Sequence, residues 1–596
     1  MTTILAQLQL IANNTIATLY KLPPNSIQVQ ISETKPEFEG DYTIVLFSLI
    51  KQLQLSPAEL GTSIGNVIIT QHPTLFTKYS VVKGFLSLTV NDTYYTNLLS
   101  IYYNDICFGK KELNGKKVMV EYSSPNTNKP LHLGHLRNNF LGWSIAEIYK
   151  ANGYEVFKTC IVNDRGIHIC KSMIAWQLYA NGATPQSTGT KGDHFVGEYY
   201  VKFNDVYKAQ MQELCDNGMD EKEAEKEAPI YKQAQQMLLQ WELGNADVIQ
   251  LWRTMNSWVY EGFDATYKKI GSDFDKTYFE SNTYLLGKDT VQQGLANNTF
   301  YKKDDGSIWI DLTNDGLDEK IVQRKDGTSV YITQDIGLAQ QKYEEFKIDS
   351  SLYVIGNEQD YHMAVLKLIC QKLELPYAND IYHLSYGMVE LPQGKMKSRE
   401  GTVVDADDIV AEMLQKSKDE TIKHGKADDF TSDELDALYT TVGLGATKFY
   451  LLRVDPKKKM VFNPEESIEF IGFTGPFIQY TYARIKSILR KNEFSENVKI
   501  TINGTSELLK LEKQLLFKIE QYTTILHTAC HENNPSIIAN YVFDVAKTFN
   551  TFYAEHSVTK AETVEKKQLR LQLSCFTANV IKSAVQLLGM QVPERM

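Results

Sequence analysis

Two histidines, His132 and His135, lie at the end of the stretch Glu121–His135, which reads E-Y-S-S-P-N-T-N-K-P-L-H-L-G-H. A β-branched apolar segment precedes this stretch and apolar residues at helical spacing follow it, so the pattern predicts a strand, a polar loop and a helix. Such a corner of an α/β sheet brings backbone donors and the positive end of a helix to an anion. Both histidines fall on one side of the first helical turn, and Gly134 lets a planar ligand approach the backbone. The residues therefore predict a phosphate-binding corner.

Other interpretations of the histidines depend on the rest of the chain. One alternative is that the two histidines have no catalytic function and are surface or capping residues, because four-residue motifs often match by chance. A metal pair is disfavoured, since helical histidine ligands are more naturally four residues apart and no third ligand is nearby. A second element favours the functional interpretation: a cationic loop, Pro392–Thr402, follows a predicted strand and precedes a predicted helix. It contains Lys395-Met396-Lys397-Ser398-Arg399.

These two elements resemble the "HIGH" and "KMSKS" signatures of the class I aminoacyl-tRNA synthetases. The stretch S-P-N-T-N-K-P-L-H-L-G-H-L-R narrows the resemblance to the arginyl-tRNA synthetase family, and the segment T-G-P-F-I-Q-Y-T-Y-A-R-I and the final P-E-R-M extend it over nearly the whole chain. The resemblance implies activation of L-arginine by ATP, as its Mg²⁺ complex, to arginyl-adenylate with release of pyrophosphate. It also implies transfer of arginine to the 2′-hydroxyl of the 3′-terminal adenosine of tRNA(Arg), with tRNA bound before activation.

Adenylate formation joins two anions at the α-phosphate, so positioning and positive charge must supply most of the catalysis. When Gly401–Val404 is aligned with the family's usual G-N-V-V, Ser398 stands where the second signature lysine belongs. Lys129 is predicted to supply the missing charge. The predicted catalytic residues are Lys129, His132, His135, Lys395 and Lys397. The predicted ATP-binding residues are His132, Gly134, His135, Glu358, His362, Lys395, Met396, Lys397 and Ser398.

Recognition of arginine requires carboxylates, because a guanidinium presents a planar fork of donors. Glu121 and Asp335 are the candidates. Each is expected at the end of a strand, since Ser329–Ile336 also has the pattern of a sheet strand. The predicted substrate-binding residues are Glu121, Ser123, Asn126, Tyr331, Asp335 and Gln359, all of which except Ser123 match family positions that contact the substrate.

The resemblance implies that the C-terminal part binds the anticodon. Its aromatic side chains could stack on bases while an arginine takes a phosphate, although aromatic residues at helical spacing more often belong to a core. The predicted tRNA-binding residues are Tyr480, Tyr482, Arg484, Tyr553 and Met596.

The order of elements predicts a multidomain α/β protein with a Rossmann-like parallel-sheet catalytic core. That core is expected over residues 111–407, with a charged helical insertion at about 180–265 whose surface is solvated. An N-terminal α+β domain is expected over residues 1–110, and the resemblance implies that it binds tRNA. A helical connector is expected over 408–465 and an all-α bundle over 466–596.

Composition is ordinary for a globular protein: 596 residues, 43% hydrophobic and 23% charged, with a net charge of −11. The seven cysteines are scattered and never form C-x-x-C, which favours a reducing cytoplasm and disfavours disulfides and a structural metal. No apolar run approaches a membrane span, and the N-terminus does not read as a signal peptide. We expect a cytoplasmic monomer.

Three alternative functions stay open: a class I synthetase for another amino acid, a catalytically silent tRNA-binding paralogue, and a nucleotidyltransferase with the same histidine corner.

Overall fold

The computed structural model describes residues 3–23, 26–35, 37–392, 404–423, 430–495 and 507–596. The predicted contacts of Lys395, Met396, Lys397 and Ser398 lie outside the described residues.

The centre of the molecule is a five-stranded parallel sheet with the strand order β12-β11-β5-β6-β7. Its middle strand, β5, is the first in the chain: β6 and β7 follow on one side of it, and β11 and β12 are added later on the other side. A crevice therefore opens at the carboxyl end of β5, at the topological switch point where parallel α/β sheets bind ligands. This sheet confirms the predicted fold class. Its strands are β5 (Lys117–Glu121), β6 (Glu155–Val162), β7 (Lys276–Phe279), β11 (Ser350–Gly356) and β12 (Ile381–Tyr386).

Helix α5 (Leu133–Ala151) begins at the predicted corner and is buried along most of its length. Arg137, in its second turn, is fully buried and its guanidinium donates to four backbone carbonyls. The carbonyls satisfy the N–H groups on both Nη atoms, whereas the buried Nε–H has no hydrogen-bond partner among the described residues. The arginine therefore ties the first turns of α5 to two loops from later in the chain, through the carbonyls of Gly387, Met388, Pro456 and Lys458.

The prediction of a strand over Ser329–Ile336 is wrong. The segment forms the start of helix α14 (Tyr331–Phe346), and the buried residues Ile332, Ile336 and Ala339 follow helical spacing. The β-branched run V-Y-I-T favoured a strand locally, but packing of the apolar stripe overrides such propensity. The strands beside this helix instead form a small antiparallel sheet with the order β10-β9-β8. They are β8 (Tyr301–Lys302), β9 (Ile308–Ile310) and β10 (Lys320–Gln323).

Helices account for the insertion after β6 and for the region between β7 and β12. In the insertion, α8 packs against both α6 and α11, so the charged segment buries one face. The insertion and the helix that leads into it comprise α6 (Ile167–Tyr179), α7 (Pro185–Thr188), α8 (Gly192–Asp216), α9 (Glu221–Glu227), α10 (Pro229–Glu242) and α11 (Ala246–Ile270). The later helices are α12 (Glu280–Thr283), α13 (Lys288–Ala296) and α15 (Asp360–Lys372).

The N-terminal unit is a four-stranded antiparallel sheet with the order β1-β2-β4-β3, covered by helices. It contacts the C-terminal bundle, where the backbone N–H of Ile4 donates to Glu520 at 2.7 Å. The strands are β1 (Gln30–Glu33), β2 (Tyr42–Val45), β3 (Phe76–Val82) and β4 (Phe85–Val90), and the helices are α1 (Ile4–Leu19), α2 (Phe47–Leu53), α3 (Pro57–Gln71) and α4 (Asp92–Tyr102).

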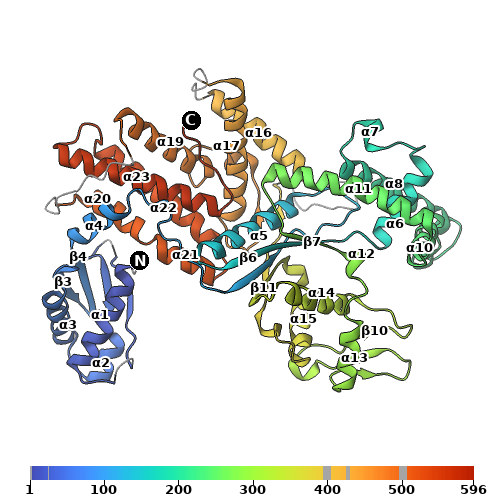
Figure 1. The fold of residues 1–596 in the computed structure, drawn as a ribbon, viewed down its shortest axis with the longest axis horizontal. Coiled ribbons are helices and arrows are strands. Elements are labelled where there is room, and N and C mark those ends of the chain that lie inside the picture. The colour runs from blue at the N-terminus through green and yellow to red at the C-terminus, as the bar shows by residue number, and fades with distance from the viewer. Residues whose placement is uncertain (1–2, 24–25, 36, 393–403, 424–429, 496–506) are drawn as a thin grey trace.

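Within the described residues, the chain from about residue 408 onward is almost entirely helical, as predicted. Figure 1 shows the parallel sheet in the middle, with the insertion on one side and the C-terminal helices on the other. None of the helices in the described part of the chain is long and apolar enough to cross a membrane. The elements are β13 (Val389–Glu390), β14 (Met460–Val461), α16 (Ala406–Lys423), α17 (Ser432–Leu452), α18 (Pro464–Ser467), α19 (Gly475–Lys491), α20 (Lys510–Glu520), α21 (Tyr522–His531), α22 (Ser536–Glu555) and α23 (Val564–Leu587).

Candidate active site

The histidine corner, residues 129–135, is built as an N-cap of α5. Nδ1 of His132 accepts a hydrogen bond from the N–H of Gly134 at 3.1 Å, and Nδ1 of His135 accepts from the N–H of His132 at 3.1 Å. Burial, with Lys129 nearby, lowers the pKa of His132 to about 3, and burial lowers the pKa of His135 well below its usual value. Both rings are therefore neutral at pH 7. Because each Nδ1 is an acceptor, each proton sits on Nε2.

The two Nε2–H groups are what this arrangement offers a ligand. The ring centroids of His132 and His135 lie 3.9 Å apart, so the two Nε2–H donors lie side by side at the N-terminal end of α5. A side chain at Gly134 would crowd this pair, since a Cβ there would lie 3.0 Å from the ring of His132. The corner is thus an uncharged pair of aimed donors at a helix N-terminus, which suits a phosphate oxygen.

Lys129 brings positive charge to the same corner. It lines a cavity of about 220 Å³ together with His132, and burial lowers its pKa. Among the described residues, no carboxylate lies within ion-pair distance of its Nζ. A half-buried, unpaired ammonium is costly unless an anion arrives, so its position agrees with the predicted catalytic role. Helix α8 of the insertion forms the opposite wall of the cavity.

Ser123 and Ser124 connect β5 to the corner in a strained conformation, with φ values of +82° and +46°. Residues other than glycine avoid this region, and such strain is held where the surroundings over-determine it. Here the hydroxyls of Ser123 and Tyr267 lie 2.7 Å apart, and Asn139 Nδ2 donates to Ser123 Oγ at 3.2 Å. Ser123 is buried, so its hydroxyl serves the loop and the prediction that it binds substrate loses its geometric support.

Asn126 lies farther along the same loop and is exposed. Its backbone pairs with Asn163 at the end of β6, where the N–H of Asn163 donates to the carbonyl of Pro125 at 2.9 Å. The asparagine side chain is therefore presented at the carboxyl edge of the sheet, which is compatible with the predicted substrate contact.

The structure changes the interpretation of Glu121. Its carboxylate is buried at the end of β5 and forms an ion pair with Lys342 of α14. Nζ of Lys342 also lies 4.9 Å from the ring centre of Tyr353. A carboxylate already neutralised by a buried ammonium is poorly placed to grip a guanidinium. The prediction that Glu121 does so is thus not supported by the geometry.

Asp335 lies on a helix and not at the end of a strand as predicted, and its role in binding arginine stays a prediction. It lies in the second turn of α14, and its Oδ2 is 2.6 Å from Nε2 of His362 on α15. The hydrogen bond to Asp335 raises the pKa of His362. Tyr331, one turn before Asp335, is 72% exposed, and Glu358 and Gln359 are exposed just before α15. The starts of the two helices thus bring the predicted residues to one edge of the sheet.

Glu280, a residue that sequence reasoning missed, completes this edge. It is the first residue of α12, directly after β7. Burial raises its pKa to about 7, Arg165 partly offsets this, and the negative charges of Asp164 and Asp335 raise it further. The signal was present in the sequence, because Glu280 ends a strand of the parallel sheet as the other candidates were expected to do. Asp335 and Glu280 are a pair of acidic groups within electrostatic reach, which suits one guanidinium.

The bundle pocket is a second concave site, with a volume of about 390 Å³. The guanidinium of Arg484 lies 4.8 Å from the ring centre of Tyr480 and 5.9 Å from that of Tyr553. Tyr482 differs: its ring is 2% exposed and its hydroxyl donates to Glu594 at 3.0 Å, so it cannot stack on a base. The pocket is lined by Thr421, Phe470, Ile471, Phe477, Tyr480, Arg484, Asn550 and Met596.

Two family models match the chain. The model described as tRNA synthetases class I (R), catalytic domain, matches residues 97–463, and the DALR anticodon binding domain matches residues 478–596. The first region holds the histidine corner, and the second holds half of the residues that line the bundle pocket, namely Tyr480, Arg484, Asn550 and Met596.

Relatives match over the full length. An arginine–tRNA ligase of Flavobacterium psychrophilum is 51% identical, with 99% of this chain and 100% of that protein covered. An arginine–tRNA ligase of Porphyromonas gingivalis is 47% identical over 100% of both. Among solved structures, Thermus thermophilus arginyl-tRNA synthetase superposes with a TM-score of 0.81 at 22% identity over 99% of each chain. The Plasmodium falciparum enzyme gives a TM-score of 0.79 at 20% identity over 100% of each.

Proposed function

This chain belongs to the class I arginyl-tRNA synthetase family, and we propose that its histidine corner performs arginine activation, the first step of the arginine–tRNA ligase reaction. ATP enters as its Mg²⁺ complex, and the carboxylate of arginine attacks the α-phosphate while pyrophosphate leaves. The product is arginyl-adenylate. Arginine then passes to the 3′-terminal adenosine of tRNA(Arg).

The observation that carries this proposal is the pair of neutral histidines whose Nδ1 atoms accept backbone hydrogen bonds. Their Nε2–H donors are fixed by the fold before ATP arrives, so no reorganisation is needed when negative charge grows on the phosphate. Lys129 adds an unpaired positive charge beside them. The lysines Lys395 and Lys397 remain a prediction for the departing pyrophosphate.

Specificity for arginine is proposed to come from Asp335 and Glu280. Burial chiefly raises the pKa of Glu280 and the negative charge of Asp335 adds to the rise, so a guanidinium between the two acidic groups would relieve their repulsion. Tyr331 and Gln359, exposed beside Asp335, are proposed to bind the rest of the substrate. Asn126 is proposed to hold its amino or carboxylate group.

The bundle pocket is proposed to receive an anticodon base, which would stack on Tyr480 with Arg484 taking charge contacts. Tyr553 and Met596 would border that base. We also propose that the N-terminal unit, residues 1–110, binds tRNA, and that the enzyme acts as a cytoplasmic monomer.

Arginine-dependent exchange of pyrophosphate into ATP, with and without tRNA(Arg), tests the proposal. We expect exchange with arginine and none with lysine, because a compact ammonium does not reproduce the planar, bidentate arrangement of donors that a guanidinium presents. We expect the rate to depend on tRNA, as the family implies. Absence of exchange with arginine and tRNA together would overturn the proposed function.

A further inference from the structure

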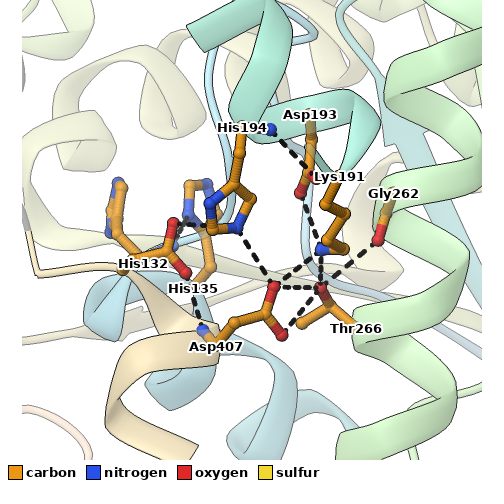
Figure 2. Close-up of polar contacts among 9 residues, drawn as sticks. His132, His135, Lys191, Asp193, His194, Gly262, Thr266 and Asp407 are labelled. Atoms are coloured by element: carbon orange, nitrogen blue, oxygen red, sulfur yellow. Dashed lines mark hydrogen bonds and ion pairs between the residues drawn. The ribbon is translucent and has the colours of Figure 1, made fainter. Parts of the chain in front are cut away.

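An ion cluster, which we call the corner clamp, joins the insertion to the N-terminal end of α16. Nζ of Lys191 lies 2.7 Å from Asp407 Oδ2, 3.0 Å from Asp193 Oδ2 and 2.6 Å from Thr266 Oγ1. Nε2 of His194 lies 3.2 Å from Asp407 Oδ2 and 3.3 Å from Asp405 Oδ2. Figure 2 shows His194 reaching from α8 toward Asp407, close to the two histidines of the corner. The clamp comprises Lys191, Asp193, His194, Thr266, Asp405 and Asp407.

The clamp is attached directly to the histidine corner through the backbone. Asp405 forms an antiparallel bridge with His132. On either side of it, the N–H of Ala406 donates to the carbonyl of Leu131 at 2.9 Å, and the N–H of Leu133 donates to the carbonyl of Val404 at 3.2 Å. A shift of Asp405 would therefore move the N-cap of α5 and the Nε2–H donors that it carries.

Close backbone packing holds the insertion in place for this contact. A Cβ on Gly197 would lie 2.8 Å from the ring of Pro130, so α8 rests directly on the segment that carries Lys129. A Cβ on Gly262 of α11 would lie 2.3 Å from Oδ1 of Asp193, and one on Gly192 would lie 2.0 Å from the carbonyl of Trp258. The two helices can approach this closely because these positions have no side chain.

The charges around His194 favour its protonated form. The hydrogen bond to Asp407 raises its pKa, against burial and with help from Asp405 and Asp193. Burial alone would raise the pKa of Asp407, but hydrogen bonds from His194 and Lys191 hold it well below its usual range. The charged groups that face the clamp are Lys191, Asp193 and Glu198 from the insertion side, Lys269 from α11, Asp405, Asp407 and Asp408 from the N-terminal end of α16, and Lys129 across the cavity.

We propose that His194 is a positioning residue for arginine activation. By bridging Asp405 and Asp407 it holds the segment of residues 404–406, which leads into α16, against the histidine corner and so sets the direction of the Nε2–H donors. This inference rests on the proposed function. It assigns a role to the insertion, whose charged sequence predicted only a solvated surface.

Asp193, His194 and Asp407 also present ligand-type atoms within 4.8 Å of one another, a spacing that a metal ion could use. Lys191 already places an ammonium between both carboxylates. The melting temperature of the protein, measured without nucleotide, should therefore not change when EDTA is added. A clear drop would place a metal there and overturn the assignment of Lys191 as the cation of the clamp.

The main experiment compares His194→Gln with the wild-type chain and with Lys208→Ala, an exposed lysine on the same helix. Glutamine keeps one donor but loses the charge. We expect kcat for pyrophosphate exchange, at saturating arginine and ATP, to fall about tenfold at pH 6.5 while the KM for arginine is unchanged, because only the reacting geometry is disturbed. Lys208→Ala should match the wild type.

The pH profile separates positioning from a general loss of stability. A group with a raised folded-state pKa gives its full effect at low pH and loses it as pH rises through that pKa. The ratio of wild-type to His194→Gln kcat should thus shrink toward one as the pH increases above neutrality. A variant with full kcat, or a ratio that stays constant with pH, would overturn the proposal. If the wild type itself shows no arginine-dependent exchange, the proposed function fails instead, and the two failures are distinct.

Discussion

The histidine corner and the bundle pocket are both proposed to bind part of a nucleotide, but the groups that line them differ in chemistry. At the corner, backbone N–H groups orient two neutral imidazoles, and the half-buried Lys129 lies in the same cavity. In the bundle pocket, most of the lining is aromatic or aliphatic, and one arginine lies over two tyrosine rings. The corner offers directed donors and the pocket offers flat apolar surface.

This difference follows from what each site must distinguish. A phosphate that gains charge during the reaction is stabilised by donors that cannot move away, so the corner is rigid and polar. A base is bound by stacking, which needs area more than direction. Changes at the corner should therefore alter turnover, while changes in the bundle pocket should alter the KM for tRNA. The following predictions test that division.

The largest effect is expected from His132→Asn. Asparagine is a good N-cap, so α5 should keep its first turn, but the variant lacks the Nε2–H donor. Loss of one such donor typically costs a factor of about 10² to 10³ in kcat. Pyrophosphate exchange measures the rate, and circular dichroism together with the melting temperature checks the fold. Normal turnover in a folded variant would show that the histidine is only a cap.

Lys129→Ala should lower kcat by roughly a hundredfold, because it removes the unpaired positive charge beside the corner. The KM for arginine should hardly change. Adding Ser398→Lys to this variant should restore part of the rate, since the charge returns from the signature loop. If Lys129→Ala hardly changes kcat while Lys397→Ala lowers it strongly, Lys129 does not replace the missing signature lysine.

Asp335→Asn should weaken arginine binding more than ATP binding. Loss of one charge-assisted hydrogen bond costs about 1.5–3 kcal/mol, which corresponds to a factor of roughly 10 to 100 in the KM for arginine. The matched control is Asp289→Asn, a change of the same chemistry on α13. An unchanged KM in Asp335→Asn would remove this residue from the arginine site.

Glu280 should make arginine binding dependent on pH. Its pKa is about 7 in the free protein, and only the ionised carboxylate attracts a guanidinium. Below pH 7 the group is mostly protonated, so the KM for arginine should be about tenfold higher at pH 6 than at pH 8. Glu280→Gln should raise the KM at pH 8 and remove this dependence. A pH dependence that persists in the variant would assign it to another group.

The smallest effect is expected from removal of Met596, the final residue, which lines the bundle pocket. Loss of one apolar contact costs about 1 kcal/mol, so the KM for tRNA should rise roughly fivefold while exchange at saturating tRNA stays normal. Val564→Ala, an exposed change on α23 outside the pocket, should leave the KM for tRNA unchanged. A loss of turnover at saturating tRNA would break the division between the two sites.

Local sequence was enough for the features that depend on neighbouring residues. The strand, loop and helix around His132 and His135 were predictable, because the apolar spacing changes from strand to helix within a few residues. The alternation of strands and helices also predicted the parallel sheet, which the fold confirms. Family resemblance then supplied the reaction, since its motifs are local too.

Tertiary structure decided the features that depend on which distant segments meet. Ser329–Ile336 has strand-forming residues, yet packing of Ile332 and Ile336 makes the segment helical from Tyr331 onward. Glu121 looked free for a guanidinium until the fold placed Lys342 against it.

The proposed roles of Glu280 and His194 also depend on the tertiary structure, because the residues that act on them come from distant segments of the chain. The field of Asp335 helps raise the pKa of Glu280, and Asp405 and Asp407 reach His194 from a helix more than two hundred residues later in the chain. The sequence by itself determined the type of corner and its chemistry. The partners that orient and charge it were decided by the tertiary fold, because burial and through-space electrostatics are properties of residues brought together, not of their order along the chain.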